Sequence, residues 1–546
     1  MSPTPPPPRV SRTAPLARIP VSRRTVLGAA AATPLLAWLA SSIPAAAVAA
    51  HPSMLHTAAG LSTVADRVAA GSQPWTGGWD RLVANGRSSA SWNPRPLETV
   101  VRGGDGSNYG QMMGDIAAAY QNALRWHIGG DRAHGDAAVR ILNAWSGTLT
   151  TVTGNADRFL ASGIYGYQWA NAAELMRGYS GFDVGRFRSM LLNVFHPMCE
   201  HFLTNHNDAV ITNYWANWDL CNMAAILSIG IFTDRDDLVS RALDYFENGA
   251  GNGSIEHAVP FVYDDEGLAQ WQESGRDQAH SIMGIGLMGT FCEMAWHQGV
   301  DCYGYGGNRF LKAAEYVAKY NLGHDVPFTD YTWQSGPNTT APHVGWHTHT
   351  EISSNSRGQV RPVWDMILGH YQGRRGLAAP WTQQIAESVR PDGGGGDYGP
   401  DSGGYDALGF TTLMHAPPTT VRIINVATGK CLDGLGRTTD GAAAGQWAGS
   451  SSANQRWVRT ASGGYTRFRN AATGLYLDGM GRTADGAAVG QWSGSGSANQ
   501  QWQVDDRRLR NRATGLYLDG MGRTTDGDDA GQWRSSTSTN QQWRIG

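Results

Sequence analysis

Residues 474–492, GLYLDGMGRTADGAAVGQW, contain a motif that occurs three times near the end of this 546-residue chain. Its Leu-Asp-Gly core recurs at Asp433, Asp478 and Asp519, and a Gln-Trp pair follows each time, ending at Trp447, Trp492 and Trp533. Each copy closes with a Gln-x-Trp sequence, ending at Trp457, Trp502 and Trp543. Short apolar runs separated by Gly, Thr, Asn and Ser are typical of strands and turns. Three such copies predict one all-β domain, a β-trefoil, over residues 417–546.

The three copies closely resemble ricin-B-type lectin domains, the family 13 carbohydrate-binding modules. The resemblance implies one sugar site per copy, made by an Asp, a later aromatic residue and an Asn. Carried onto this sequence, the sites are Asp433, Trp447 and Asn454; Asp478, Trp492 and Asn499; and Asp519, Trp533 and Asn540. A carboxylate accepts from sugar hydroxyls while an aromatic face covers the apolar side of the ring. A role in the core alone is favoured for the tryptophans of the Gln-x-Trp pairs.

Upstream of the repeats, residues 51–416 have apolar residues at helical spacing. The expected helices cover about 110–127, 133–147, 163–180, 218–232, 237–248, 279–297 and 309–321. Helix pairs joined by loops, without a strand repeat, predict an all-α (α/α) toroid or barrel. Since successive loops of such an array alternate between its two ends, the loops at 148–162, 249–278 and 322–358 should share one end, together with 204–217 and 391–406.

The first fifty residues are rich in Pro and Arg and contain Arg23-Arg24, an Ala/Leu stretch and the small residues Ala47-Val48-Ala49. This order resembles a twin-arginine export signal, and we assign residues 1–50 to it. The alternative is a membrane anchor, but the stretch from Thr25 to Ala40 is short for a span and contains Pro34. We therefore expect a secreted protein.

Composition and net charge bear on the partners that the chain can have. The chain has 41% apolar and 16% charged residues and a net charge of -3, so nothing favours nucleic acid or an anionic membrane as partner. We expect a monomer without cofactor or metal. The cysteines are odd in number and lack ligand spacing, and only a disulfide between Cys292 and Cys302 is left open.

Three peptides rich in polar and aromatic residues fall on the predicted common end. They are residues 213–219 (NYWANWD), residues 270–280 (QWQESGRDQAH) and the His-rich residues 342–349 (PHVGWHTH). Together with residues 357–362 (RGQVRP), the first two resemble the alginate-lyase superfamily of polysaccharide lyases, which includes helical-barrel relatives acting on mannuronan or glucuronan. The resemblance covers about residues 100–415. These peptides lack the Asn-His dipeptide of some related lyases, which leaves the identity of the carboxylate-neutralising residues open.

The resemblance implies β-elimination from a 1,4-linked uronic-acid polymer, an anionic polysaccharide. The C5 proton of a uronate becomes removable once the neighbouring carboxylate is neutralised, and we assign this to Asn217 and Arg276. The base is left open among His280, Tyr214 and Tyr263, and a tyrosine is a plausible acid for the departing O4. Further predicted substrate-binding residues are Asn213, Trp218, Trp271, Gln278, His347, Arg357 and Arg361.

Each of these residues has a structural alternative. The alternative for Arg276 is a purely structural ion pair with Glu273 or Asp277, and the alternative for His280 is a core histidine. Asn213 or Asn217 would suit a helix N-cap. The histidines at 343, 347 and 349 suit a weak metal site or an exposed loop, and Trp215, Trp218 and Trp271 suit either the core or sugar stacking.

Two other functions compete with the lyase. A glycoside hydrolase on the same barrel would need two carboxyl groups about 5 to 10 Å apart. Candidates are Asp264, Asp265, Glu266, Glu273 and Asp277. The second alternative is a polysaccharide-binding protein without catalysis. The neighbouring Arg, His and Asn favour an acidic sugar and hence the lyase.

Overall fold

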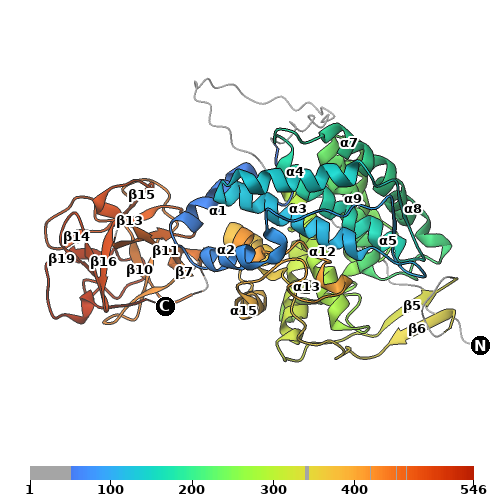
Figure 1. The fold of residues 1–546 in the computed structure, drawn as a ribbon. Coiled ribbons are helices and arrows are strands. Elements are labelled where there is room, and N and C mark those ends of the chain that lie inside the picture. The colour runs from blue at the N-terminus through green and yellow to red at the C-terminus, as the bar shows by residue number, and fades with distance from the viewer. Residues whose placement is uncertain (1–50, 338–342, 419, 451, 463, 546) are drawn as a thin grey trace, which may run out of the picture. The chain divides into compact units, whose positions relative to one another are not determined.

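The computed structural model describes residues 51–337, 343–418, 420–450, 452–462 and 464–545 (Figure 1). The export signal predicted for residues 1–50 lies outside these residues. The chain forms two compact units. The first extends to Leu368 and includes Ala379–His415, and the second comprises Gly369–Ala378 and Ala416–Gly546.

An inner layer of the first unit consists of helices buried on all sides. Along the chain they are α3 (Gly110–Gly129), α6 (Gly166–Met176), α9 (Ala216–Thr233), α12 (Gln278–His297) and α14 (Trp364–Leu368). Each contacts the next, and α9 and α12 are buried along almost their whole length. A helix that is apolar all round is stable only when other elements surround it.

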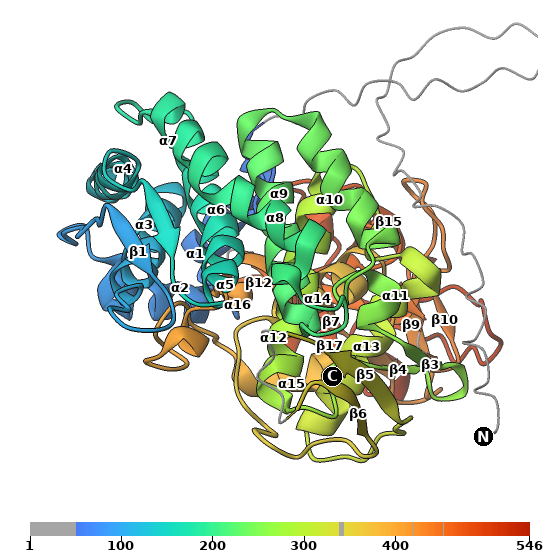
Figure 2. The ribbon, with the colours of Figure 1, turned by 90° about the vertical axis from the view of Figure 1, so that its right-hand side faces the viewer.

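An outer layer covers these helices. It contains α4 (Arg132–Ser146), α8 (His196–Asn205), α10 (Asp236–Asn248), α13 (Tyr305–Asn321) and α15 (Pro380–Val389). Each packs on its inner neighbour in the chain, as α10 does on α9 and α13 on α12. α10 buries Leu238, Ala242, Tyr245 and Phe246, which form one helical stripe. The helical class predicted from the sequence is therefore confirmed (Figure 2).

Short elements complete the helical unit. α1 (Ala58–Ala69), α2 (Trp75–Ala84) and α16 (Thr411–His415) connect α14 back to α3 through the contacts α14–α16, α16–α1 and α1–α3. Three two-stranded sheets lie in loops: β1 (Thr99–Val101) with β2 (Thr151–Thr153), β3 (Phe261–Tyr263) with β4 (Leu268–Gln270), and β5 (Tyr331–Ser335) with β6 (Gly345–His349). The remaining short helices are α5 (Arg158–Leu160), α7 (Val184–Met190) and α11 (Ile255–Ala258).

The helix expected at 163–180 differs in the structure. Instead, α5 leads through a π-helical segment, Ala161–Tyr165, into α6. Gly163 lies so close to α9 that a Cβ there would be 2.4 Å from the Cys221 Sγ, so this contact requires glycine. A helical stretch that the sequence did not reveal, α7 to α8, fills residues 184–205 and runs between α6 and α9. Because this additional helical segment crosses the unit between α6 and α9, the 148–157 loop and the 206–215 loop lie at the same end of the unit.

The second unit is the predicted β-trefoil. Its principal strands are β8 (Ile423–Asn425), β9 (Cys431–Asp433), β10 (Gly445–Trp447), β11 (Trp457–Ser462), β12 (Tyr465–Asn470), β13 (Tyr476–Asp478), β15 (Gly490–Trp492), β16 (Trp502–Asp505), β17 (Arg508–Asn511), β18 (Tyr517–Asp519), β19 (Gly531–Trp533) and β20 (Trp543–Ile545), with the short β7 (Thr420–Val421) and β14 (Ala487–Ala488). In each repeat the Leu-Asp strand pairs antiparallel with the Gln-Trp strand, so that Tyr476 faces Trp492 and Tyr517 faces Trp533.

The trefoil core shows the same repetition. Trp457, Trp502 and Trp543 are fully buried and belong to one cluster with Leu432, Leu477 and Leu518. Each indole Nε1 donates to the backbone oxygen of the leucine in its own repeat, at 2.9 to 3.0 Å. The Gln-x-Trp tryptophans are therefore core residues, as the sequence favoured.

The described part of the chain has no helix that is both long and apolar enough to cross a membrane. All five cysteines are buried free thiols, so the disulfide left open between Cys292 and Cys302 does not form. Among the described residues no group of three or more His, Cys, Asp or Glu side chains is arranged to hold a metal ion.

Candidate active site and sugar sites

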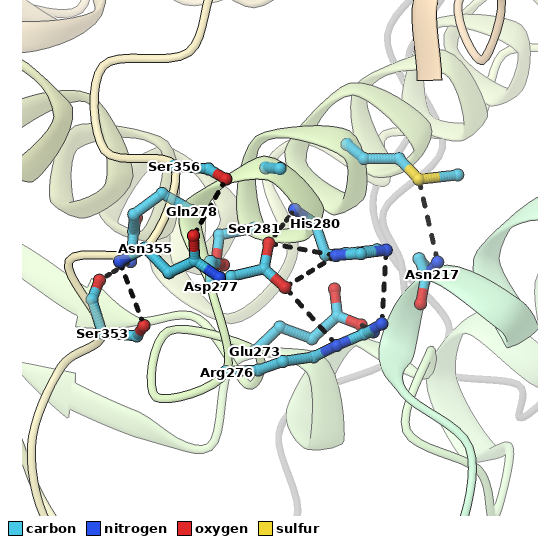
Figure 3. Close-up of polar contacts among 12 residues, drawn as sticks. Asn217, Glu273, Arg276, Asp277, Gln278, His280, Ser281, Ser353, Asn355 and Ser356 are labelled. Carbon is cyan, nitrogen blue, oxygen red and sulfur yellow. Dashed lines mark hydrogen bonds and ion pairs between the residues drawn. The ribbon is translucent and has the colours of Figure 1, made fainter. Parts of the chain in front are cut away.

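The start of α12 fixes the central histidine of the candidate active site. Asp277 is the N-cap of α12, and its Oδ1 accepts the backbone N–H of His280 at 2.8 Å. Its Oδ2 lies 2.7 Å from the Nδ1 of the same histidine (Figure 3). Asp is among the preferred N-cap residues, so one carboxylate starts the helix and orients the imidazole. Burial opposes ionisation of Asp277, but its hydrogen bonds with His280 and the charge of Arg276 lower its pKa below the ordinary value.

Arg276 precedes this cap and determines the tautomer of His280. Its Nη2 lies 3.2 Å from the His280 Nε2. A guanidinium has no acceptor, so Nε2 must accept and the ring proton must be on Nδ1, facing Asp277. The imidazole is thus neutral with a lone pair on Nε2, which is the form that a general base requires. The side chains of Arg276 and His280 are 27% and 36% exposed, so a ligand can reach both.

Glu273 lies beneath Arg276 and is completely buried. Its Oε1 accepts from the Arg276 Nη1 at 3.2 Å, while its Oε2 has no hydrogen-bond partner among the described residues. Burial raises the pKa of Glu273 to about 7, against the opposing charge of Arg276. Two carboxylates therefore hold Arg276, because its Nε also lies 3.5 Å from Asp277.

Asn217 reaches the site from α9. It is 2% exposed, and its Nδ2 makes only a long contact of 3.7 Å with the Met283 sulfur. Met283 follows His280 by three residues on α12, which places Asn217 beside the same helix face (Figure 3). Its Oδ1 has no partner among the described residues. A weakly engaged, buried amide suits exchange of the sulfur contact for a ligand.

Aromatic residues of the β5–β6 hairpin and of the α9 N-cap form a wall beside Arg276. The Arg276 guanidinium lies over the Trp215 ring, with Cζ 5.3 Å from the ring centroid. Trp215 in turn contacts Trp333 and His349, with ring centroids 4.8 and 5.8 Å apart. Burial, and then the charges of His347 and Arg276, lower the pKa of His349. Gly275 permits this packing, since a Cβ there would lie 2.5 Å from the Cβ of His349.

Several predicted site residues are engaged elsewhere. Tyr214 is buried, its hydroxyl accepts from Asn207, and burial raises its pKa. The hydroxyl of Tyr263, on β3, donates to the Gln270 Oε1 at 2.8 Å. Neither tyrosine contacts His280 or Arg276, so the structure favours His280 among the three candidate bases.

The predicted substrate-binding residues mostly support loops. Trp271 is fully buried against Gly284, and Asn213 accepts the backbone N–H of Gly336. Neither Asn213 nor Asn217 is a helix N-cap, because Trp215 occupies that position of α9. The others have these contacts: Trp218 stacks on Phe202, Gln278 donates to the backbone oxygens of Ser274 and Ser353, His347 bonds Ser335, Arg357 donates to the backbone oxygens of Tyr320 and His324, and Arg361 forms a buried ion pair with Asp406 at 2.7 Å.

The carboxylates considered for a hydrolase separate into two groups. Asp264, Asp265 and Glu266 form an exposed turn between β3 and β4, where Asp264 pairs with Lys312. Glu273 and Asp277 are buried and hold Arg276 and His280. This arrangement does not leave a pair of carboxyl groups facing a substrate.

The sequence reasoning missed a second guanidinium. Arg102, at the end of β1, is 8% exposed and donates to the Tyr165 hydroxyl at 3.2 Å. Its Cζ lies 5.3 and 5.4 Å from the ring centroids of Tyr109 and Tyr165. Burial raises the pKa of Asp406, opposed by the charge of Arg361 and by the hydrogen bond from the Tyr398 hydroxyl. An arginine directly after a short strand was the only sequence signal.

The predicted sugar sites of the trefoil are three copies of one arrangement. Asp433, Trp447 and Asn454 line a cavity of about 410 Å³ in the first repeat. Trp447, Trp492 and Trp533 are 44%, 42% and 39% exposed, in contrast to the buried Gln-x-Trp tryptophans. The Oδ1 of Asp433, Asp478 and Asp519 each accepts a backbone N–H two residues further on, at 2.6 to 2.7 Å. Asn499 accepts from the Gly481 N–H as Asn454 does from Gly436, which leaves the amide NH2 groups for a ligand. Asn540 occupies the same place, since a Cβ at Gly522 would lie 3.6 Å from its Nδ2.

Comparisons with known proteins agree with both units. Residues 83–326 match the family model described as alginate lyase, and residues 410–492 and 498–546 match the model described as ricin-type β-trefoil lectin domain-like. By this match, the helical unit is the catalytic domain of a polysaccharide lyase. The protein carries an alginate lyase domain, followed by a ricin-B-type β-trefoil lectin domain.

Similar solved structures cover about a quarter of the chain. ThreeFoil, a designed threefold-symmetric protein, is 35% identical with a TM-score of 0.22, over 23% of this chain and 96% of that one. The Macrolepiota procera ricin B-like lectin, solved with lactose, is 26% identical with a TM-score of 0.21, over 23% and 94%. An exo-β-1,3-galactanase from Clostridium thermocellum is 27% identical with a TM-score of 0.22, over 26% and 32%. No curated protein matches the chain.

Proposed function

We propose that the protein is an exported, monomeric lyase that cleaves a 1,4-linked uronic-acid polymer, polymannuronate (alginate) or glucuronan, by β-elimination. The observation that carries this proposal is the contact of Arg276 with the unprotonated Nε2 of His280, with Asp277 behind the ring. An accessible cation beside a neutral imidazole is what an acidic sugar needs for removal of its C5 proton.

Binding of the substrate would prepare the base. The uronate carboxylate takes up the donors of Arg276 and Asn217, so the Nη2 that now points at His280 turns to the ligand. The Nε2 lone pair is then free to take the C5 proton, while the neutralised carboxylate stabilises the enolate-like charge. Asp277 stabilises the imidazolium that forms, as a carboxylate on Nδ1 does in hydrolytic triads.

The second half of the reaction breaks the C4–O4 bond. The electron pair left by the C5 proton forms the C4–C5 double bond, and O4 departs with the electrons of its bond to C4. The imidazolium of His280 returns a proton to O4, which restores the neutral base. The products are one fragment with a 4,5-unsaturated uronate at its new non-reducing end and one fragment with a new reducing end, whose anomeric hydroxyl contains the former O4.

The trefoil would hold the enzyme at its polymer. Binding of the polymer at the sugar sites raises the effective concentration of chain segments near the active site. Residues 1–50 would direct export by the twin-arginine route before either unit meets its substrate.

Purified protein tested on polymannuronate, polyguluronate, glucuronan and hyaluronan would decide the reaction. We expect ultraviolet absorbance from unsaturated uronate ends on at least one of the first three polymers. New reducing ends without that absorbance would indicate a hydrolase, and no cleavage of any polymer would leave only a binding protein.

A further inference from the structure

The three sugar sites of the trefoil differ in charge although their architecture repeats. An arginine follows the Asp-Gly-x-Gly turn in every repeat, at Arg437, Arg482 and Arg523. Arg437 lines the cavity of the first site. Its Nη1 donates to the backbone oxygen of Ala443 at 3.1 Å, and Arg482 and Arg523 make the same contact to Ala488 and Asp529, at 3.1 and 2.8 Å. All three guanidinium groups therefore occupy equivalent positions beside a sugar site.

A neighbouring repeat supplies a loop beside each exposed tryptophan. A Cβ at Gly527 would lie 3.4 Å from the Trp447 ring, at Gly441 3.4 Å from the Trp492 ring, and at Gly486 3.3 Å from the Trp533 ring. The loop beside the first site is Asp526-Gly527-Asp528-Asp529, beside the second Asp440-Gly441-Ala442-Ala443, and beside the third Asp485-Gly486-Ala487-Ala488. The first site therefore has two carboxylates beside it, Asp528 and Asp529, where the second and third sites have alanines.

This replacement changes the state of the arginines. Arg437 forms an ion pair with Asp529, at 3.0 Å between Nη1 and Oδ1. Arg482 and Arg523 are exposed, and neither has an ion-pair partner among the residues that the structure describes. Asp440 and Asp485, which stand where Asp526 does, point to other partners: Asp440 accepts from Ser493 and Asp485 pairs with Arg534. The second and third sites therefore each present a guanidinium whose remaining N–H groups are available.

We infer that the second and third sugar sites of the trefoil select a sugar bearing a carboxylate, whereas the first site takes a neutral sugar. Arginine binds a carboxylate through two parallel N–H donors, so a uronate held by Asp478 and Trp492 can place its acid group on Arg482. In the first site the same group would meet Arg437 already neutralised, with Asp528 close by. This inference rests on the proposed function, because it makes the polymer that the helical unit cleaves the ligand of two lectin sites.

The test uses the full chain with Arg276→Ala, so that oligosaccharides are bound without being cleaved. Affinities are measured calorimetrically at low salt for two probes, a tetrasaccharide of 1,4-linked mannuronate and neutral lactose. The variants are Arg482→Ala with Arg523→Ala, the matched Arg437→Ala, and Asp528→Ala with Asp529→Ala. Any ligand bound by the helical unit contributes equally to all of them.

We expect the double arginine variant to bind the tetrasaccharide about three- to fivefold more weakly at each site, as exposed ion pairs worth up to about 1 kcal/mol imply. Its lactose affinity should change less than twofold, and the difference between the two probes should shrink at high salt. Arg437→Ala should weaken tetrasaccharide binding less than twofold. Removing the two aspartates should instead add a third site for the tetrasaccharide.

An equal loss for both probes, or unchanged tetrasaccharide affinity in the double variant, would overturn the inference. The unsaturated-product assay on the unmodified protein is independent of these titrations. If the unmodified protein forms unsaturated product but the titrations show no preference for the charged probe, only this inference fails. If the titrations show the charge preference but no unsaturated product forms, the lyase proposal fails while the two sites for a carboxylate sugar stand.

Discussion

In the helical unit, Asn217, Arg276 and His280 come from two helices and a loop, and each has a different partner and a different task. In the trefoil, Asp478, Trp492 and Asn499 lie within one repeat, and the same set is present twice more. The first region uses buried charges whose positions depend on one another. The second exposes its aromatic rings on strands that a repeated core supports. A single substitution should therefore abolish the function of the first region but remove only one sugar site of the second.

The largest effect is expected from Arg276→Ala. Loss of a donor to developing negative charge costs about 10² to 10³ in rate, and Arg276 also contacts the base. We expect kcat/KM on the polymer to fall about a thousandfold with an unchanged fold. Arg241, which pairs with Glu200 at 3.0 Å on the outer helices, gives the matched control Arg241→Ala, with activity within twofold. Near-normal activity of Arg276→Ala would contradict the expectation that a single substitution abolishes the function of the helical unit.

Asp277→Asn should lower kcat about a hundredfold without loss of folding. Asparagine is as good an N-cap as aspartate, so α12 should still begin at Gln278. However, an amide cannot stabilise the imidazolium, and its NH2 favours the tautomer with the proton on Nε2. Steady-state kinetics and the melting temperature should thus separate, with a large fall in kcat and a small change in Tm. If both changed together, the role of Asp277 would be structural only.

Glu273→Gln tests the charge buried under Arg276. Burial gives Glu273 a pKa of about 7 in the folded protein, against an ordinary 4.5, so the folded state binds the proton more tightly than the unfolded state. Its contribution to stability is complete below pH 4.5 and is lost as the pH rises to about 7, by up to about 3 kcal/mol. The glutamine variant should lack this slope in Tm between these two pH values. Parallel curves for both proteins would mean that Glu273 does not titrate there.

The smallest effect is expected from Trp492→Ala. It removes one of the two exposed rings that we expect to bind the uronan, so polymer affinity should fall about threefold while the melting temperature stays unchanged. Trp502→Ala is the contrasting control, since loss of a buried core tryptophan costs about 3 to 5 kcal/mol and should destabilise the trefoil. A tenfold or larger loss from Trp492→Ala alone would show that the three sites are not used independently.

Local patterns were sufficient for the trefoil. Its strands, its buried Trp457, Trp502 and Trp543 and its exposed Trp447, Trp492 and Trp533 follow from a motif that repeats three times. The apolar periodicity also located α9 and α12 to within two residues at each end. It missed α7 to α8, because that stretch is interrupted by the π-helical turn at Leu191–Phe195 and by Pro197.

By itself, the sequence determined the two-domain organisation, the class of each unit and the peptide around Arg276 and His280, since these depend on periodicity and on neighbours along the chain. Only the tertiary structure decided which polar residues come together at the candidate site. Trp215 lies under Arg276 and contacts His349, and Asn217 reaches Met283 on α12, while Trp271, Gln278 and Arg361 support the fold. The reason is physical: a side chain's role depends on its burial and partners, and packing between distant segments sets both.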